Sequence, residues 1–266
     1  MDYFCNWCKS QRSLEGYTVI VTGCNTGIGK DTCVDLYKRG ANIIMACRDI
    51  RKASQAKEDI IKQVYFEGHK GSITIEKLDL SSLKSVRECA FSILKKEDKI
   101  NILINNAGVM MCPKDTTEDG FEMQMGTNHF GHALLTLLLL PRIIMSAPSK
   151  IINLSSVAHN SAKCYARSKI ANILFARALH LKLREHSIEN VNTYSVHPGI
   201  VRTELSSDCQ IKDPSQQCRD DEEALKFFDL TLKILKLENY NPFGELGPID
   251  TFEANIMENT FKKSLI

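Results

Sequence analysis

Short apolar or β-branched runs alternate with longer amphipathic stretches between residue 18 and about residue 200. These runs predict six strands, which are Thr18–Thr22, Asn42–Cys47, Ile73–Leu78, Ile100–Ile104, Lys150–Leu154 and Asn190–Val196. Short strands separated by helical patterns are typical of a parallel sheet that carries helices on both faces. We therefore expect an α/β fold with a doubly wound parallel sheet in three layers, αβα.

Two helices can be assigned within this part of the chain. The first, Lys30–Arg39, places four apolar residues on one face and ends at Gly40, a residue type that often follows the last turn of a helix. The second, Ala133–Leu140, is apolar except for Thr136. It is shorter than the ~20 residues that cross a bilayer, so we expect a buried helix and no transmembrane span.

The pattern weakens beyond Leu205. Ala224–Leu237 predicts one amphipathic helix, with Leu225, Phe228, Leu232 and Leu235 aligned on it, and Asn239–Pro248 predicts a loop. No further parallel strand can be placed in this tail.

The 266 residues are enough for one large domain with a sizeable core, and the chain contains no internal repeat. We expect an N-terminal extension over residues 1–13 and a main domain over residues 14–205. A divergent, partly helical tail over residues 206–266 would complete the same domain.

Composition and charge narrow the class of protein. The net charge of +2 gives no reason to expect a nucleic-acid partner. No basic segment followed by an apolar run opens the chain, so a secretory signal is not expected. The ten cysteines are scattered, as in an intracellular protein with reduced thiols. Cys5 and Cys8 form a CxxC pair without a second ligand pair, so we expect no metal site.

A glycine-rich turn links the first predicted strand to the first predicted helix. It reads Thr22, Gly23, Cys24, Asn25, Thr26, Gly27, Ile28, Gly29 and Lys30. Glycines let a backbone approach a pyrophosphate, and a helix N-terminus supplies N–H donors, so the turn predicts a Rossmann-type dinucleotide site. A P-loop is excluded because it would need glycine at position 24 and Ser or Thr at position 31, where the chain has Cys24 and Asp31.

Four further motifs follow in order. They are Asn105-Asn106-Ala107-Gly108, Ser155-Ser156, Tyr165-xxx-Lys169 and His197-Pro198-Gly199. With the glycine turn, this series resembles the short-chain dehydrogenases/reductases over residues 14–205. The stretches around Arg48, Asn128 and Ser168 resemble more narrowly the retinol dehydrogenase branch. The resemblance implies cofactor contacts by Asn106, Ala107, Gly108, Pro198, Val201 and Thr203, and by Asp79 and Leu80 near the adenine.

The second predicted strand is followed by Arg48. Sites specific for NAD usually carry an acidic residue here, whereas an arginine accommodates a 2′-phosphate. Lys30 adds a second positive charge near the same corner. We therefore expect NADP(H) as the cofactor.

Tyr165 is the predicted proton donor to a carbonyl oxygen. Lys169 lies four residues further on, which places both side chains on one face of a helix, and its ammonium would lower the tyrosine pKa. Ser156, preferred to Ser155, would hydrogen-bond the substrate oxygen. The resemblance gives Asn128 a role in linking the lysine to water, with a buried structural amide as the alternative.

Other residues near these motifs have simpler interpretations. Met110, Met111 and Cys112 are candidates for the substrate pocket, although core packing is the preferred interpretation. His129 and His132 are interpreted as packing residues and not as metal ligands.

The chain departs from the family between Ser156 and Tyr165, which are nine positions apart, whereas relatives have a longer segment. This difference leaves the cofactor site intact and puts the substrate site in doubt. The leading hypothesis is an NADP(H)-dependent oxidoreductase that interconverts a lipophilic alcohol and its aldehyde or ketone, with retinol and retinal as candidates.

The alternatives are a cofactor-binding protein with impaired catalysis and an interaction role for the tail. A homo-oligomer stays open. We expect an intracellular protein, either cytoplasmic or peripherally associated with the endoplasmic reticulum membrane.

Overall fold

The computed structural model describes residues 10, 12–65, 71–156, 163–199, 220–244, 246–247, 252–253 and 256. The predictions for Cys5, Cys8, Val201, Thr203 and the segment 157–162 fall outside these residues.

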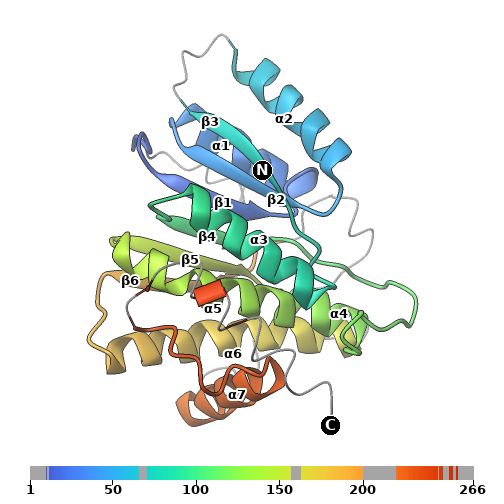
Figure 1. Cartoon of the computed structure of the whole chain (residues 1–266). Helices are drawn as coiled ribbons and strands as arrows, with labels where there is room; N and C mark the ends of the chain where they lie inside the picture. Colours follow the sequence, from blue (N-terminus) through green and yellow to red (C-terminus); the bar gives the residue numbers. More distant parts are fainter. Residues whose placement is uncertain are drawn as a thin grey trace, which may run out of the picture.

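Six parallel strands form one sheet in the order β3-β2-β1-β4-β5-β6 (Figure 1). The strands are β1 (Thr18–Thr22), β2 (Asn42–Cys47), β3 (Ser72–Lys77), β4 (Ile102–Asn105), β5 (Ser149–Leu154) and β6 (Val191–Val196). The direction of winding reverses between β1 and β4. In open α/β sheets, ligands bind at the carboxyl ends of the strands at such a reversal.

All six predicted strands are present, and β1 and β2 have the predicted bounds. The start of β4 was predicted two residues too early, because the Ile100 N–H bonds to the Ser146 hydroxyl (2.9 Å) and not to a neighbouring strand. Val21 pairs with Ile104 in the ladder. The turns that follow β1 and β4 therefore emerge next to each other.

Helices cover both faces of the sheet, which confirms the three-layer Rossmann-type arrangement. Helices α1 (Gly27–Lys38) and α2 (Ile50–Val64) pack on one face, where their apolar residues share a core with alternate residues of β1 and β2. Helices α3 (Leu83–Lys96), α5 (Gly131–Met145) and α6 (Lys163–Glu185) share the core on the opposite face. Short helix α4 (Met123–Met125) and π-helix η1 (Gly126–Phe130) lead into α5.

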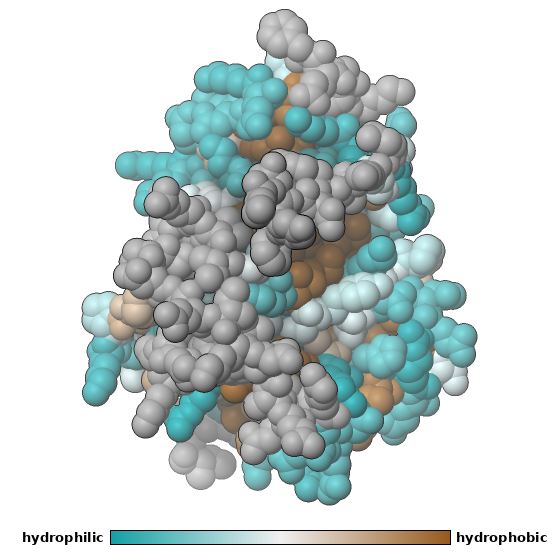
Figure 2. Space-filling model, turned by 180° about the vertical axis from the view of Figure 1, so that it is seen from behind, coloured by the Kyte–Doolittle hydropathy of each residue, from teal (hydrophilic) through white to brown (hydrophobic). Residues whose placement is uncertain are grey.

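Burial along β6 falls toward its carboxyl end. Val191 is fully buried, whereas Tyr194 and Val196 are 43% and 41% exposed. The view from behind shows a hydrophobic, hollowed area in the middle of the molecule, below the hydrophilic upper part (Figure 2). The carboxyl end of β6 is therefore less covered by the described residues than β1, in which all five residues are buried.

The apolar segment Ala133–Leu140 is a buried part of α5, as predicted, but the helix continues through Pro141 to Met145. Pro141 has no N–H, so it cannot donate to the Leu137 carbonyl, which is the usual acceptor four residues earlier. The Tyr240 hydroxyl donates to this carbonyl (3.1 Å) from the C-terminal segment. No helix in the described ranges is long and apolar enough to cross a membrane.

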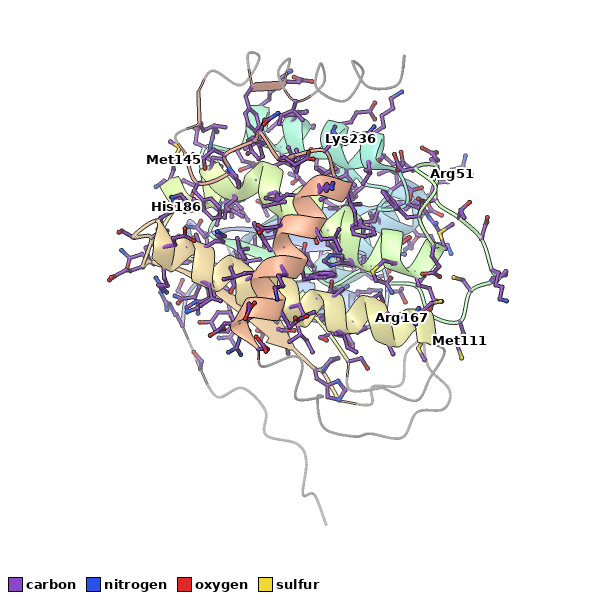
Figure 3. The ribbon with its side chains drawn as sticks, turned by 90° about the horizontal axis from the view of Figure 1, so that it is seen from below. Arg51, Met111, Met145, Arg167, His186 and Lys236 are labelled. Atoms are coloured by element: carbon purple, nitrogen blue, oxygen red, sulfur yellow. The ribbon has the colours of Figure 1, made fainter. Side chains whose placement is uncertain are left out.

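The predicted tail helix is α7 (Asp221–Ile234), which begins and ends three residues earlier than expected. The Asp220 carboxylate caps it by accepting from the N–H groups of Glu222 and Glu223. Its buried residues are Ala224, Phe228 and Thr231. Of the expected stripe, Phe228 and Leu235 are buried, whereas Leu225 and Leu232 are half-buried. Helix α7 packs across α6 (Figure 3).

Candidate cofactor-binding and active site

The glycine turn lies flat against the segment that follows β4. A Cβ atom on Gly23, whose φ is +59°, would lie 2.6 Å from the Ala107 Cβ. A Cβ atom on Gly29 would lie 2.5 Å from the Asn106 Nδ2. Both distances are shorter than any allowed contact, so the two elements can meet only with glycine at these positions.

Hydrogen bonds hold the glycine turn against the segment that follows β4. The Asn106 side-chain amide donates to the carbonyls of Thr22 (2.8 Å) and Gly23 (3.2 Å). The Thr22 hydroxyl oxygen accepts from the N–H groups of Asn106 and Ala107, each at 3.0 Å. The structure thus brings together the two motifs predicted at the cofactor site, and Asn106 and Ala107 form the seat of the turn.

The N-terminus of α1 opens directly from the turn. The helix begins at Gly27, three residues before the predicted Lys30, because the low helix propensity of glycine hid the first turn from the sequence pattern. Thr26 is the N-cap in an extended conformation and makes no side-chain cap hydrogen bond. Asn25 and Ile28 are half-buried beside it. Backbone N–H groups without a side-chain cap, next to glycines that have no side chains, fit the pyrophosphate of a dinucleotide.

Arg48, directly after β2, is exposed. Its backbone carbonyl accepts from the Lys77 ammonium. Within the part of the chain that the structure describes, its guanidinium makes no ion pair. A cation at the carboxyl end of β2 is therefore available to an anionic ligand.

Lys30, the second predicted cation, forms an ion pair with a residue of α2. Its Nζ lies 2.7 Å from the Asp59 carboxylate, which also accepts from the Gln55 amide (3.1 Å). The bond from Lys30 is the main reason that the pKa of Asp59 is lowered. The expected contact of Lys30 with a 2′-phosphate stays a prediction, and it would compete with this ion pair.

Asp79 and Leu80, the predicted adenine contacts, follow β3. The Asp79 carboxylate accepts from the Ser81 N–H (3.0 Å) and hydroxyl (2.6 Å), which stabilises the turn. The Leu80 side chain is buried in the core, and its carbonyl lies 2.5 Å from where a Cβ of Gly131 would be. The turn-forming role is thus observed, and contact with an adenine stays a prediction.

Tyr165 and Lys169 are both buried, at 6% and 4% exposed, one turn apart on α6. The Lys169 Nζ lies 5.5 Å from the centre of the Tyr165 ring and donates to the Leu154 carbonyl (3.0 Å). A Cβ on Gly108 would lie 3.5 Å from the same Nζ. Burial lowers the pKa of Lys169 to about 8. The Lys169 ammonium therefore faces the segment that seats the glycine turn.

The two serines after β5 differ in their contacts. The Ser155 hydroxyl donates to the Lys169 carbonyl (2.8 Å), and its N–H donates to the Val196 carbonyl (2.8 Å). Ser155 thus has a structural role at the end of the strand. Ser156 is half-buried one position further on, and its contact with a substrate oxygen stays a prediction.

Asn128 is fully buried in η1. Its side-chain carbonyl accepts from the Val109 N–H (2.7 Å), and its amide donates to the Val109 carbonyl (2.9 Å) and the Ser168 hydroxyl (3.0 Å). Ser168 in turn donates to the Tyr165 carbonyl (2.8 Å). The structural amide is therefore observed, and a part in a proton relay stays a prediction.

The remaining predicted residues are partly described. Pro198 is half-buried, and Gly199 has a φ of +79°. Met111 is 59% exposed, so the preferred interpretation of it as a core residue is wrong; the main chain turns it outward at a φ of +50°. Met111 and Arg167 lie at the end of the molecule where α6 begins (Figure 3).

No group of three or more His, Cys, Asp or Glu residues in the described ranges could hold a metal ion. The described cysteines, which are Cys24, Cys33, Cys47, Cys89, Cys112 and Cys164, are free thiols. His129 and His132 are buried, in agreement with the packing interpretation. Sequence reasoning missed the polar contacts of Thr22, Ser168 and His132, because a hydroxyl or imidazole within an apolar stretch gives no periodic signal.

The sequence matches the family described as short chain dehydrogenase over residues 17–213. The chain therefore belongs to the short-chain dehydrogenase family. Within it, the chain resembles the retinol dehydrogenases: it is 48% identical to human retinol dehydrogenase 13 over 215 residues, which cover 74% of this chain and 63% of that protein. Human retinol dehydrogenase 12 is 44% identical over 214 residues, covering 74% and 66%. The chain thus spans less than two thirds of the length of each relative.

Solved structures share the fold. An uncharacterised protein from Mycobacterium paratuberculosis is 30% identical, with a TM-score of 0.68 over 84% of this chain and 94% of that one. The NADP complex of RhlG from Pseudomonas aeruginosa gives a TM-score of 0.61 at 23% identity, over 92% and 89% of the two chains.

The alignment with human retinol dehydrogenase 13 is 215 residues long, whereas 74% of the 266 residues of this chain is fewer than 215. The relative therefore carries residues in the aligned stretch that have no counterpart here. This agrees with the shortened connection predicted between Ser156 and Tyr165.

Proposed function

We propose that this chain is an NADP(H)-dependent oxidoreductase that interconverts a lipophilic alcohol and its aldehyde or ketone, with retinol and retinal as the leading candidate pair. One observation carries the proposal. The segment Asn106–Gly108 seats the glycine turn on one side and lies against the Lys169 ammonium on the other. A cofactor held by the turn would therefore extend toward Tyr165.

The residues fit a nicotinamide dinucleotide, which would supply or accept a hydride at the carbonyl carbon. In the reducing direction, the Tyr165 hydroxyl donates its proton to the carbonyl oxygen, which completes the alcohol; oxidation returns the proton to Tyr165. The Lys169 ammonium favours the phenolate that reduction leaves behind. The Ser156 hydroxyl donates a hydrogen bond to the same oxygen, which stabilises negative charge as it develops there.

The preference for NADP(H) over NAD(H) rests on Arg48, the exposed cation at the end of β2. Replacing a partner of a charged hydrogen bond costs about 1.5–3 kcal/mol, which corresponds to roughly tenfold to a hundredfold in affinity. We expect Arg48→Asp to weaken NADPH binding by this factor and to change NADH binding much less. Equal affinity of the unmodified protein for both cofactors would contradict the proposal.

The activity is tested by NADPH oxidation with a panel of aldehydes that includes retinal. Tyr165→Phe removes the proton donor and keeps the ring, so turnover should fall by about 10²–10⁴-fold. NADPH affinity should stay within a few-fold, as titration of cofactor fluorescence would show. Residual turnover within a few-fold of the unmodified protein would exclude Tyr165 as the acid.

A second candidate function is cofactor binding without efficient turnover. The short spacing of nine positions from Ser156 to Tyr165 favours it, together with the residues that the relative has in excess. A displacement of ~1 Å in the active site can cost about 10²-fold in rate. This candidate predicts NADPH binding with poor reduction of bulky aldehydes, and faster reduction after a family-length segment is inserted before Tyr165. If retinal is reduced equally fast with and without the insertion, the segment is not limiting.

We keep two expectations with the proposed function. One is an intracellular location, cytoplasmic or at the surface of the endoplasmic reticulum membrane. The other is a small-molecule substrate, with no nucleic-acid partner and with the oligomeric state open. Cell fractionation with a high-salt wash tests the first, because recovery only after detergent extraction would contradict it.

A further inference from the structure

A buried imidazole joins the glycine turn to the helix that carries Asn128. His132 lies in the first turn of α5 and is 2% exposed. Its Nε2 is 2.8 Å from the Thr22 hydroxyl oxygen, at the end of β1. Its Nδ1 is 3.0 Å from the Asn128 carbonyl oxygen, in η1. The ring therefore bridges two elements that lie 110 residues apart in sequence.

The hydrogen-bond donors around Thr22 determine which ring nitrogen carries the proton. The Thr22 oxygen already accepts from the N–H groups of Asn106 and Ala107, both at 3.0 Å. A hydroxyl oxygen has two acceptor positions, so its remaining interaction is donation of its own hydrogen. The acceptor of that hydrogen is the His132 Nε2. The Nδ1 atom must then carry the ring proton and donate it to the Asn128 carbonyl.

The imidazole stays neutral in this arrangement. Burial lowers the pKa of His132 to about 3, and the nearby Lys169 charge acts in the same direction. A protonated ring would place an N–H on Nε2, facing a hydroxyl that has no free acceptor position. Charge and hydrogen bonding thus select the same single tautomer.

Both ends of this bridge lead to the candidate site. Thr22 precedes Gly23, and the amides it accepts from belong to the seat of the turn. On the other side, η1 is a π-helical turn in which the Gly131 N–H bonds to the Gly126 carbonyl, five residues back. Such turns often mark functional sites. From there, the Asn128 side chain reaches Tyr165 through the Ser168 hydroxyl.

We propose that His132, fixed as the Nδ1–H tautomer, is a positioning residue that couples the cofactor turn to the π-turn supporting Tyr165. The proposal rests on the proposed function, because it assigns the Thr22 side of the ring to cofactor binding and the Asn128 side to turnover. His132 touches neither cofactor nor substrate in this role. It fixes the cofactor-binding part of the site and the part that carries Tyr165 in position relative to each other.

His129, in the preceding π-turn η1, provides a matched control. It is also fully buried, but its Nδ1 lies 3.2 Å from the Asn172 side-chain oxygen, and its ring packs against the rings of Phe130, Phe175 and Phe227. Loss of this imidazole should therefore lower stability without separating cofactor affinity from turnover. Any shared effect of removing a buried histidine appears in both sets of variants.

Two substitutions divide the functions of the His132 ring. In His132→Asn, the amide nitrogen takes the place of Nδ1 and keeps the donor to Asn128, while the Thr22 hydroxyl loses its acceptor. In His132→Gln, the side-chain oxygen takes the place of Nε2 and keeps that acceptor, while the Asn128 carbonyl loses its donor. A buried group left without a partner should therefore change the affected affinity or rate by about tenfold.

The expected results are opposite for the two variants. His132→Asn should raise the Kd for NADPH about tenfold and leave kcat within about threefold. His132→Gln should lower kcat about tenfold and leave the NADPH affinity within about threefold. His129→Asn and His129→Gln should lower only the Tm. If the His132 variants lose affinity and turnover together, in proportion to Tm as a packing residue would, the coupling role is wrong.

The tautomer can be tested without changing His132. Nitrogen NMR of protein labelled at histidine distinguishes an Nδ1–H ring from an Nε2–H ring, and His129→Asn and His197→Asn remove the signals of the two other described histidines with buried ring nitrogens. We expect an Nδ1–H signal that does not titrate between pH 5 and 8. An Nε2–H ring or a titrating one would overturn the proposal, even if the His132 variants fail to fold.

A chain that binds NADPH but reduces no carbonyl would contradict the proposed function. The NADPH affinities of the variants and the tautomer of the ring would still test the role of His132.

Discussion

The glycine turn and the C-terminal segment are held in place by different kinds of contact. At Gly23 and Gly29 the backbone of the turn lies directly against Ala107 and Asn106 of the segment after β4, which leaves no room for a Cβ on either glycine. The C-terminal segment is held by side chains that reach distant partners, such as Tyr240 on Leu137 and Glu253 on Lys95 (2.6 Å).

The difference explains why one region could be recognised in the sequence and the other could not. A backbone contact requires glycine at fixed spacing, so it leaves a motif. A side-chain contact between residues 103 positions apart requires only a hydroxyl and a carbonyl in the folded chain, so it leaves none. We therefore expect the two regions to respond differently to substitution.

The largest effect is expected at the glycine turn. Gly23→Ala adds a Cβ in a left-handed conformation, which costs about 1–2 kcal/mol, and forces it against Ala107, which costs about 1–3 kcal/mol more. We expect a loss of roughly 4 kcal/mol in the free energy of unfolding, measured with urea, and loss of NADPH binding.

Gly16→Ala is the matched control. Its φ is +80°, but no atom lies within 4 Å of the added Cβ. It should therefore cost only the conformational part, about 1–2 kcal/mol. If the two substitutions cost the same, the close backbone contact is not what holds the turn.

Most of the strand layout could be predicted because the apolar runs are short and well separated. The site could be predicted only where a motif specifies it. Tyr165 and Lys169 share a face of α6 as their four-residue spacing requires. The ion pair between Lys30 and Asp59 could not be foreseen, because the two residues lie 29 positions apart on different helices.

The tail helix illustrates the same limit. Its apolar pattern indicated a helix correctly, but Thr231 lies in the buried stripe where Leu232 was expected. Thr231 can be buried because its hydroxyl donates to the Phe227 carbonyl (2.9 Å) within the helix. A pattern that counts threonine as polar places the stripe one residue away.

The second prediction concerns the buried cation at the junction of the two halves of the site. The pKa of Lys169 falls from 10.5 to about 8 on folding. The unfolded chain therefore binds more protons between these two values, and this group makes the folded state more stable as pH rises from 8 to 10.5. Below pH 8 the full cost of burying the charge is present, about 3 kcal/mol.

Lys169→Met should remove this cost along with turnover. The Leu154 carbonyl keeps the Asn172 amide as a donor (3.2 Å), so it is not left unsatisfied. We expect the variant to be more stable than the unmodified protein by up to about 3 kcal/mol at pH 7, and the gain to shrink toward zero by pH 10.5. A stability difference that does not change with pH would show that the ammonium is not desolvated.

The third prediction tests the long-range contact of the tail. Tyr240→Phe leaves the Leu137 carbonyl without the hydroxyl donor, which should cost about 1–3 kcal/mol of stability and leave NADPH affinity unchanged. Pro141→Ala restores an N–H at the position from which a helix normally serves that carbonyl. In this background Tyr240→Phe should lower the free energy of unfolding much less. An equal loss of stability in both backgrounds would mean that the hydroxyl does not replace the donor that Pro141 lacks.

The smallest effect is expected where a side-chain contact borders the cofactor turn. Asp59 holds Lys30 through an ion pair whose side chains are 42% and 27% exposed, so the pair itself contributes about 0.2–1 kcal/mol. Asp59→Asn keeps the size of the side chain and the amide contact, but it removes the charge that competes for Lys30. If Lys30 can reach a 2′-phosphate, the ratio of NADPH to NADH affinity should rise about two- to fivefold, and the gain should fade at high salt because exposed charges are screened.

Asp35→Asn is the control, since its partner Arg39 (2.7 Å) lies at the other end of α1. An unchanged ratio in Asp59→Asn would leave Arg48 as the cation that determines the preference, and it would make Lys30 a structural residue between α1 and α2.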